Sequence, residues 1–177
     1  MQRDIARRNG CNRITMILQI YTIIHTLISL VAIFTGLIVL FGMIGGKRLD
    51  AWTKWFLITA VLTTVTGFFF PFHGFTPAIR LGIISLPFLA VTIFARCLKQ
   101  LAGAWRWIYV IGAAACLYFN LFVLVVQSFL KIAALHALAP TQTETPFKLT
   151  QLLVLLLSVV LAGLALVRFH PERARAL

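Results

Sequence analysis

Residues 16–44 read MILQIYTIIHTLISLVAIFTGLIVLFGMI, an apolar run that contains no aspartate and no glutamate. A helix needs about 20 apolar residues to cross the roughly 30 Å hydrocarbon core of a bilayer, and this run is longer. It is also longer than the roughly 7–15-residue apolar core of a signal peptide, and no small-residue cleavage pattern follows it. We therefore expect an uncleaved first transmembrane helix.

Four further apolar runs predict four more helices, over residues 55–72, 79–98, 107–130 and 147–169. The second and third are separated by a proline-rich hairpin at residues 70–77, and the last two by a polar loop at 140–146. We predict an all-α, polytopic transmembrane helix bundle of five helices over residues 16–169, with four helices as the alternative count. A basic segment at 1–15 precedes the bundle, and a basic tail at 170–177 follows it.

The composition agrees with a lipid-embedded chain. Hydrophobic residues make up 61% of the sequence and charged residues 11%, whereas a soluble domain carries about 25% charged residues. The formal net charge is +12, but the lysines and arginines lie in short segments between the apolar runs. That pattern indicates topology and contact with anionic headgroups. We expect the lipid bilayer, and other membrane protein subunits, as partners, and no nucleic acid.

The membrane orientation depends on these basic connections. All four tryptophans and many lysines and arginines follow the first and third helices, but the four N-terminal arginines fall on the opposite side. The basic residues divide almost evenly between the two sides. We expect an outside N-terminus and a cytoplasmic C-terminus.

Known catalytic machinery is not recognisable in the chain. The predicted spans contain no carboxylate, which argues against a proton relay because such relays use intramembrane acids. Cys11, Cys97 and Cys116 show no metal-binding spacing and no disulfide framework. Hydrolase, zinc-protease, phosphate-loop and dinucleotide motifs are all absent, so the sequence assigns no enzymatic activity.

One face of the fourth predicted helix is polar. At about 100° per residue, Cys116, Asn120, Gln127 and Lys131 fall within one narrow stripe. Lipid cannot satisfy an amide, so this stripe is expected to face the bundle interior or a wet cavity. The first and second helices carry comparable faces of small and hydroxyl residues, whose alternative interpretation is helix packing alone.

Three histidines belong to the same half of the membrane in a five-helix topology: His25 in the first helix, His73 in the hairpin and His136 after the fourth helix. Imidazole can bind a metal or haem, or hydrogen-bond a quinone. We therefore predict a ligand-binding pocket lined by His25, His73, Asn120, Gln127, Lys131 and His136. Interface histidines without any ligand are the alternative.

Three segments resemble a family of small multi-pass inner-membrane proteins of proteobacteria whose activity is uncharacterised. They are residues 67–77 (GFFFPFHGFTP), 104–109 (AWRWIY) and 136–142 (HALAPTQ). The resemblance extends over about residues 21–169. It implies a bacterial inner (cytoplasmic) membrane location, and it assigns no functional residue.

Three functional hypotheses follow from the sequence. The first is a membrane protein whose polar interior binds a small ligand or cofactor, with a quinone or a metal centre as candidates. The second is a non-catalytic accessory or assembly subunit whose seams receive a partner helix. The third is a channel or carrier for a small solute. The polar stripe favours it, but the stripe lacks the charge that would identify the solute.

Overall fold

The computed structural model describes residues 2–71 and 77–170, and every regular element in these ranges is an α-helix. In chain order the helices are α1 (Gln2–Ile44), α2 (Asp50–Gly67), α3 (Pro77–Cys97), α4 (Trp105–Lys131), α5 (Ala133–Leu138) and α6 (Thr145–Arg168). The predicted all-α bundle is confirmed.

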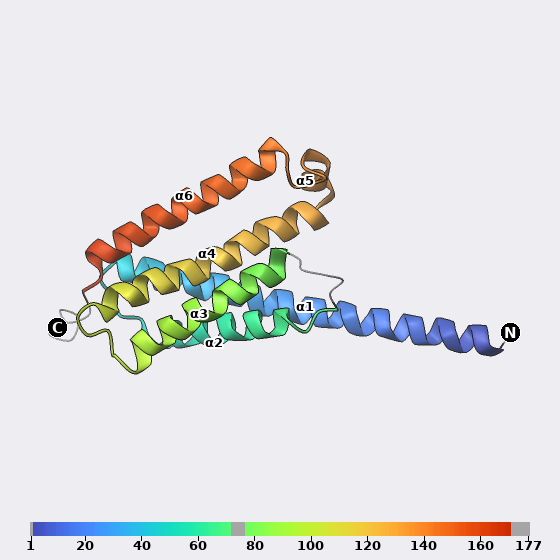
Figure 1. Ribbon diagram of the computed structural model, residues 1–177, viewed down its shortest axis with the longest axis horizontal. Coiled ribbons are helices and arrows are strands. Elements are labelled where there is room, and N and C mark those ends of the chain that lie inside the picture. Colours follow the sequence, from blue (N-terminus) through green and yellow to red (C-terminus); the bar gives the residue numbers. More distant parts are fainter. Residues whose placement is uncertain (1, 72–76, 171–177) are drawn as a thin grey trace.

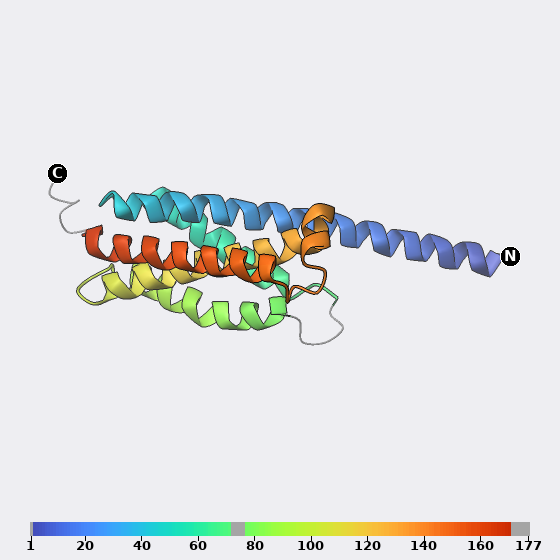
Figure 2. The same ribbon diagram turned by 90° about the horizontal axis from the view of Figure 1, so that it is seen from above.

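The five long helices lie side by side and alternate in direction, while the short α5 lies between α4 and α6 (Figures 1 and 2). Helix α1 projects well beyond the others at its N-terminus. We call the end with the α1–α2 turn and the α3–α4 loop the core end, and the end with α5 the open end. The start of α1 and the end of α6 lie at opposite ends of the bundle, because the five long helices alternate in direction (Figure 1).

The helix bounds differ from the predictions mainly in α1 and α2. Helix α1 begins at Gln2, so the predicted basic segment is part of this helix. The helix ends before Gly45, as expected. Gly46 adopts φ +69° in the following turn, a conformation that glycine adopts without steric cost. The prediction that the second helix covers 55–72 was wrong: α2 begins and ends five residues earlier. Between the fourth predicted helix and the polar loop at 140–146, the structure contains the additional short helix α5.

Four helices are long and apolar enough to cross a membrane: Thr15–Ile44, Ile79–Cys97, Trp105–Lys131 and Thr145–Arg168. Helix α2 is less apolar because it carries Asp50, Lys54 and several threonines. It nevertheless packs along α1, and its 18 residues extend about 27 Å, close to the thickness of the hydrocarbon core. The chain is a multi-pass membrane protein.

Buried apolar side chains gather near the core end. They include Ile33, Val39, Leu40 and Met43 of α1, Phe56 and Leu57 of α2, Leu89 and Ala95 of α3, and Tyr109, Val110, Ala113 and Leu117 of α4. In the half toward the open end, the described residues that are buried reduce to Ser85, Phe129, Ala139 and Gln151. The bundle is therefore closed at one end and loosely packed at the other, and α4 and α6 diverge from α1 toward the open end (Figure 1).

Two glycines make the closed end possible. A methyl group added at Gly36 of α1 would lie 2.7 Å from the Phe56 ring and 2.9 Å from a Leu117 methyl. A methyl group at Gly112 of α4 would collide with the hydroxyl of Thr92 in α3. Close approach of backbones at small residues is how helices associate in lipid, where no hydrophobic force acts between them.

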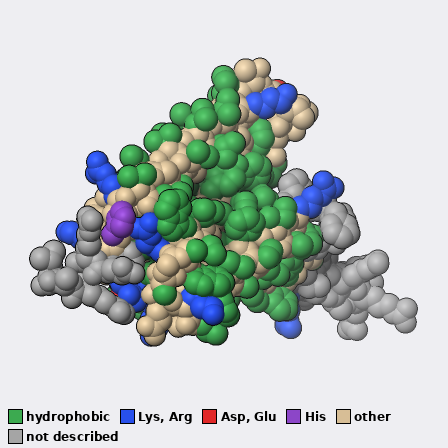
Figure 3. Space-filling view, turned by 60° about the vertical axis from the view of Figure 1, so that its left-hand side comes forward, with side chains coloured by type: hydrophobic (Ala, Val, Ile, Leu, Met, Phe, Trp, Pro, Cys, Tyr) green, Lys and Arg blue, Asp and Glu red, His purple; other side chains and the backbone are tan. Residues whose placement is uncertain are grey.

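Hydrophobic side chains cover much of the face shown in the space-filling view (Figure 3). Helix α6 is the clearest case, because leucines and valines such as Leu153 (57% exposed), Leu156 and Val160 lie exposed along it. In water such a surface would be unfavourable, whereas in a bilayer it faces lipid tails.

We predict that Gly112→Ala destabilises the bundle while Gly163→Ala does not. The added methyl group at 112 must displace Thr92, which is fully buried and bonded to the Phe88 carbonyl at 2.6 Å, and overpacking of this kind costs about 1–3 kcal/mol. No atom lies within 4 Å of the methyl position at 163. Alanine there should leave the stability unchanged or increase it by up to about 1 kcal/mol, because alanine has a higher helix propensity than glycine. Unfolding in detergent, monitored by circular dichroism, measures both.

The control is the Gly112→Ala substitution made in a protein that also carries Thr92→Ala. The second substitution should relieve most of the penalty at residue 112, because the colliding hydroxyl is gone. Equal effects of alanine at 112 and at 163 would contradict the packing account.

Candidate functional site

A recess of about 750 Å³ lies in the loosely packed half of the bundle. Side chains of α1, α2, α3 and α4 line it, together with Gln142 from the loop before α6. Its volume is within the range of roughly 300–1,000 Å³ typical of small-molecule sites. The recess exists because the helices that touch closely at the core end separate toward the open end.

Four of the six predicted site residues line this recess: His25, Asn120, Gln127 and Lys131. His136 does not, because α5 places it on the exposed surface, so the prediction that it joins the others was wrong. His73 lies outside the described residues. Whether the four residues bind a ligand stays a prediction.

The polar stripe of α4 faces inward along its length. Tyr109, Gly112 and Cys116 are buried in the core, and Asn120 and Gln127 continue the same face into the recess. Asn120 donates its Nδ2 hydrogen to the Cys116 carbonyl at 2.9 Å, which leaves its Oδ1 as an acceptor. The side-chain amide of Gln127 makes no hydrogen bond to any described residue, so both its oxygen and its nitrogen remain available.

His25 is held in one orientation on the opposite wall. Its Nδ1 lies 2.8 Å from Thr66 Oγ1, and that hydroxyl donates to the Leu62 carbonyl at 2.6 Å. Because the hydroxyl has one hydrogen, Nδ1 is assigned as the donor to it, and Nε2 is left as an acceptor. Phe70 packs edge-on against the imidazole, with ring centroids 5.1 Å apart.

Thr63 was not predicted as a site residue, although it lines the recess. The neighbouring Thr59, Thr64 and Thr66 each donate to the carbonyl four residues earlier, as hydroxyls in membrane helices commonly do. The hydroxyl of Thr63 is buried and has no hydrogen-bond partner. An unpaired buried hydroxyl costs free energy, and a bound polar group or water would recover it.

Helix α3 also contributes to the recess, which sequence reasoning missed. Gly82 and Ser85 lie on its wall, and the Phe68 ring packs against Gly82 so closely that an added methyl group would lie 3.0 Å from it. Their three-residue spacing places them on one helix face, but nothing in that spacing distinguishes them from an ordinary packing seam.

The described residues contain no group of three histidine, cysteine, aspartate or glutamate side chains arranged to hold a metal ion. The recess instead combines neutral donors and acceptors with one lysine. This chemistry suits hydrogen bonding to a ligand with a polar head more than metal coordination.

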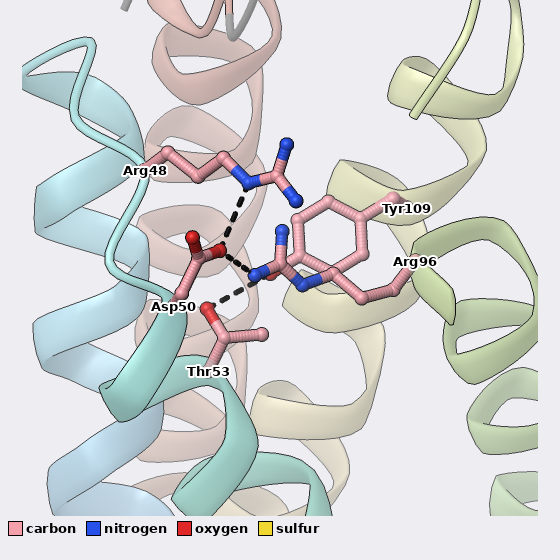
Figure 4. A network of polar contacts seen from close by, with 5 residues as sticks. All are labelled: Arg48, Asp50, Thr53, Arg96 and Tyr109. Atoms are coloured by element: carbon pink, nitrogen blue, oxygen red, sulfur yellow. Dashed lines mark hydrogen bonds and ion pairs between the residues drawn. The ribbon is translucent and has the colours of Figure 1, made fainter. Parts of the chain in front are cut away.

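A second polar cluster lies at the core end (Figure 4). Asp50 accepts hydrogen bonds from Arg48 at 2.9 Å and from Arg96, so one carboxylate joins the α1–α2 turn to α3. Arg96 lies 5.7 Å from the centroid of the buried Tyr109 ring, whose hydroxyl donates to Thr53 at 3.3 Å. The residues of this cluster do not line the recess, and their position indicates a structural role in closing the core end.

Partial burial acts to raise the pKa of Asp50, but the hydrogen bonds and charges of Arg96 and Arg48 outweigh it and hold this pKa below its ordinary value of 3.8. The carboxylate is 63% exposed, so solvent screens these interactions. The cluster therefore makes a modest, salt-sensitive contribution to stability.

The fold is that of a helical multi-pass membrane protein, and the recess lies near one end of its bundle. Comparison with known proteins found no matching family model, no matching curated protein and no matching solved structure. The functional argument consequently depends on the geometry of the recess.

We expect the free energy of unfolding to fall less steeply at acidic pH in Asp50→Asn than in the wild-type protein. Because the folded-state pKa of Asp50 is depressed, its contribution is complete above the unfolded-state pKa and is lost as the pH falls through the folded-state pKa. The wild-type protein should lose more stability than the variant on acidification from about pH 5. The difference should shrink in high salt. Parallel curves for the two proteins would contradict a role for this carboxylate.

We also expect the recess to contain water. In a protein whose native cysteines are replaced by alanine, Gln127→Cys should react at least roughly tenfold faster with a charged methanethiosulfonate than Leu153→Cys on the outer face of α6. The reagent attacks the thiolate, which forms in water and not in lipid tails. Equal rates would place Gln127 in contact with lipid and remove the basis of the site.

Proposed function

We propose that this protein is a small multi-pass protein of a bacterial inner membrane that binds an amphiphilic small molecule in the recess. The single observation that carries the proposal is the collection of unused polar groups within a largely apolar wall. These groups are the hydroxyl of Thr63, Nε2 of His25, Oδ1 of Asn120, the amide of Gln127 and the ammonium of Lys131.

The rim of the recess supports an amphiphile as the ligand. Leu30, Leu124 and Leu130 line the recess and are also 36–48% exposed, so they lie where the recess meets the surrounding lipid. A molecule with a polar head can place the head among the inner polar groups and leave its apolar body over these leucines. A quinone and a lipid both have this form.

The two rival functions have less support. A channel needs a continuous path, but between the recess and the core end the helices are in close contact, Gly36 with Phe56 and Gly112 with Thr92. An accessory subunit needs a free seam for a partner helix, but the small-residue seam at Gly36 already receives Phe56 and Leu117 of the same chain.

A filled-recess variant tests the proposal. Ser29 lines the recess, and Ser29→Phe should occupy its space and reduce the amphiphile that co-purifies with the protein by about tenfold, equivalent to about 1.4 kcal/mol. Leu153→Phe, on the exposed face of α6, is the matched control and should change nothing. The measurement is mass spectrometry of lipid and quinone extracts per mole of protein purified in a mild non-ionic detergent.

Equal amounts of co-purified amphiphile per mole of the two variants, with both correctly folded, would overturn the proposal. Circular dichroism and thermal unfolding of each variant show whether the fold is retained. Loss of ligand together with loss of fold would require the smaller Ser29→Leu substitution as a second test.

A further inference from the structure

The charge of the recess is one-sided. Among the described residues that line it, Lys131 alone has a charged side chain, and none is an aspartate or a glutamate. Lys131 also forms no ion pair with a described carboxylate. Asp50 is bound by two arginines at the core end, and Glu144 accepts hydrogen bonds from the backbone and hydroxyl of Thr141 and from the backbone of Thr143.

The position of Lys131 relates this charge to the other polar groups. Lys131 is the last residue of α4, and Gln127 lies one turn earlier on the same face. Lys131 and Gln127 of α4 line the recess together with His25 of α1. A ligand head between these helices would therefore meet a cation and an amide donor together.

A lysine at the carboxyl end of a helix also has a role without any ligand, because it compensates the helix dipole. That role would leave the preference for one ligand over another unaffected. The two roles are therefore separable by comparing ligands that differ only in head charge.

We propose that the occupant of the recess is an anionic amphiphile, whose carboxylate or phosphate head binds Lys131 and Gln127. This inference rests on the proposed function and narrows it to one class of ligand. The apolar body of the molecule extends over the rim formed by Leu30, Leu124 and Leu130 into the bilayer. A charge-assisted hydrogen bond from an ammonium to such a head is about twice as strong as one between neutral groups.

Photo-crosslinking with two probes tests the inference. The protein is placed in nanodiscs of neutral phosphatidylcholine with palmitic acid carrying a diazirine near its head, or with the matching alcohol. In the wild-type protein the acid should label peptides that line the recess about tenfold more than the alcohol does, equivalent to about 1.4 kcal/mol. Lys131→Gln should abolish this preference, and Lys131→Arg should retain it.

Lys148→Gln is the control variant, because Lys148 is an exposed lysine near the same end of the bundle that does not line the recess. It should leave the preference unchanged. Competition by unlabelled palmitate and by hexadecyl phosphate then identifies whether carboxylate or phosphate is the better head. Failure of both to compete would overturn the inference.

The outcomes separate this inference from the proposed function. Equal labelling of the recess by acid and alcohol, unchanged in Lys131→Gln, would overturn the anionic head and leave amphiphile binding intact. Labelling of the recess no stronger than labelling around Leu153 on α6, for both probes, would overturn both.

Discussion

Two glycines allow close contact between helices near the core end, and the rest of the structure depends on them. Gly36 admits the Phe56 ring between α1 and α2, and Gly112 admits the Thr92 side chain between α3 and α4. In lipid, helix association relies on such close van der Waals contact, because burial from water contributes nothing between spans. Both glycines lie in the half of the bundle toward the core end. Helices held closely at one end and inclined to each other must separate at the other, and the recess follows from that geometry.

The sequence predicted the long helices well where the local sequence alone decides that a helix forms. A span in lipid must satisfy its own backbone hydrogen bonds, so an uninterrupted apolar run indicates a helix without reference to its neighbours. This holds for α3, α4 and α6, whose observed bounds differ by only a few residues from those expected. It fails for α2 because Asp50 and Lys54 resemble a polar loop. Their cost is offset by tertiary contacts, among them Arg96 of α3, that no local pattern reveals.

The site was predictable only along a single helix. Helical periodicity placed Asn120, Gln127 and Lys131 on one face, and an amide cannot be left in lipid, so their inward direction followed. Which other helices stand opposite that face depends on the packing, and this is why Thr63 and the wall of α3 were missed. His136 was expected to join the site on the basis of membrane depth alone, but α5 turns it outward to the surface.

The open half of the bundle is therefore maintained at a cost in stability. Few described residues there are buried as Phe56 and Tyr109 are at the core end, and the hydroxyl of Thr63 is buried without a partner among the described residues. An unpaired buried polar group costs about 1–3 kcal/mol, which helix packing elsewhere must offset. A molecule that pairs these groups recovers that free energy on binding. Its apolar body also replaces lipid contacts over the leucine rim without loss. Under the proposed function, the same gap that weakens the empty bundle supplies part of the affinity for the ligand.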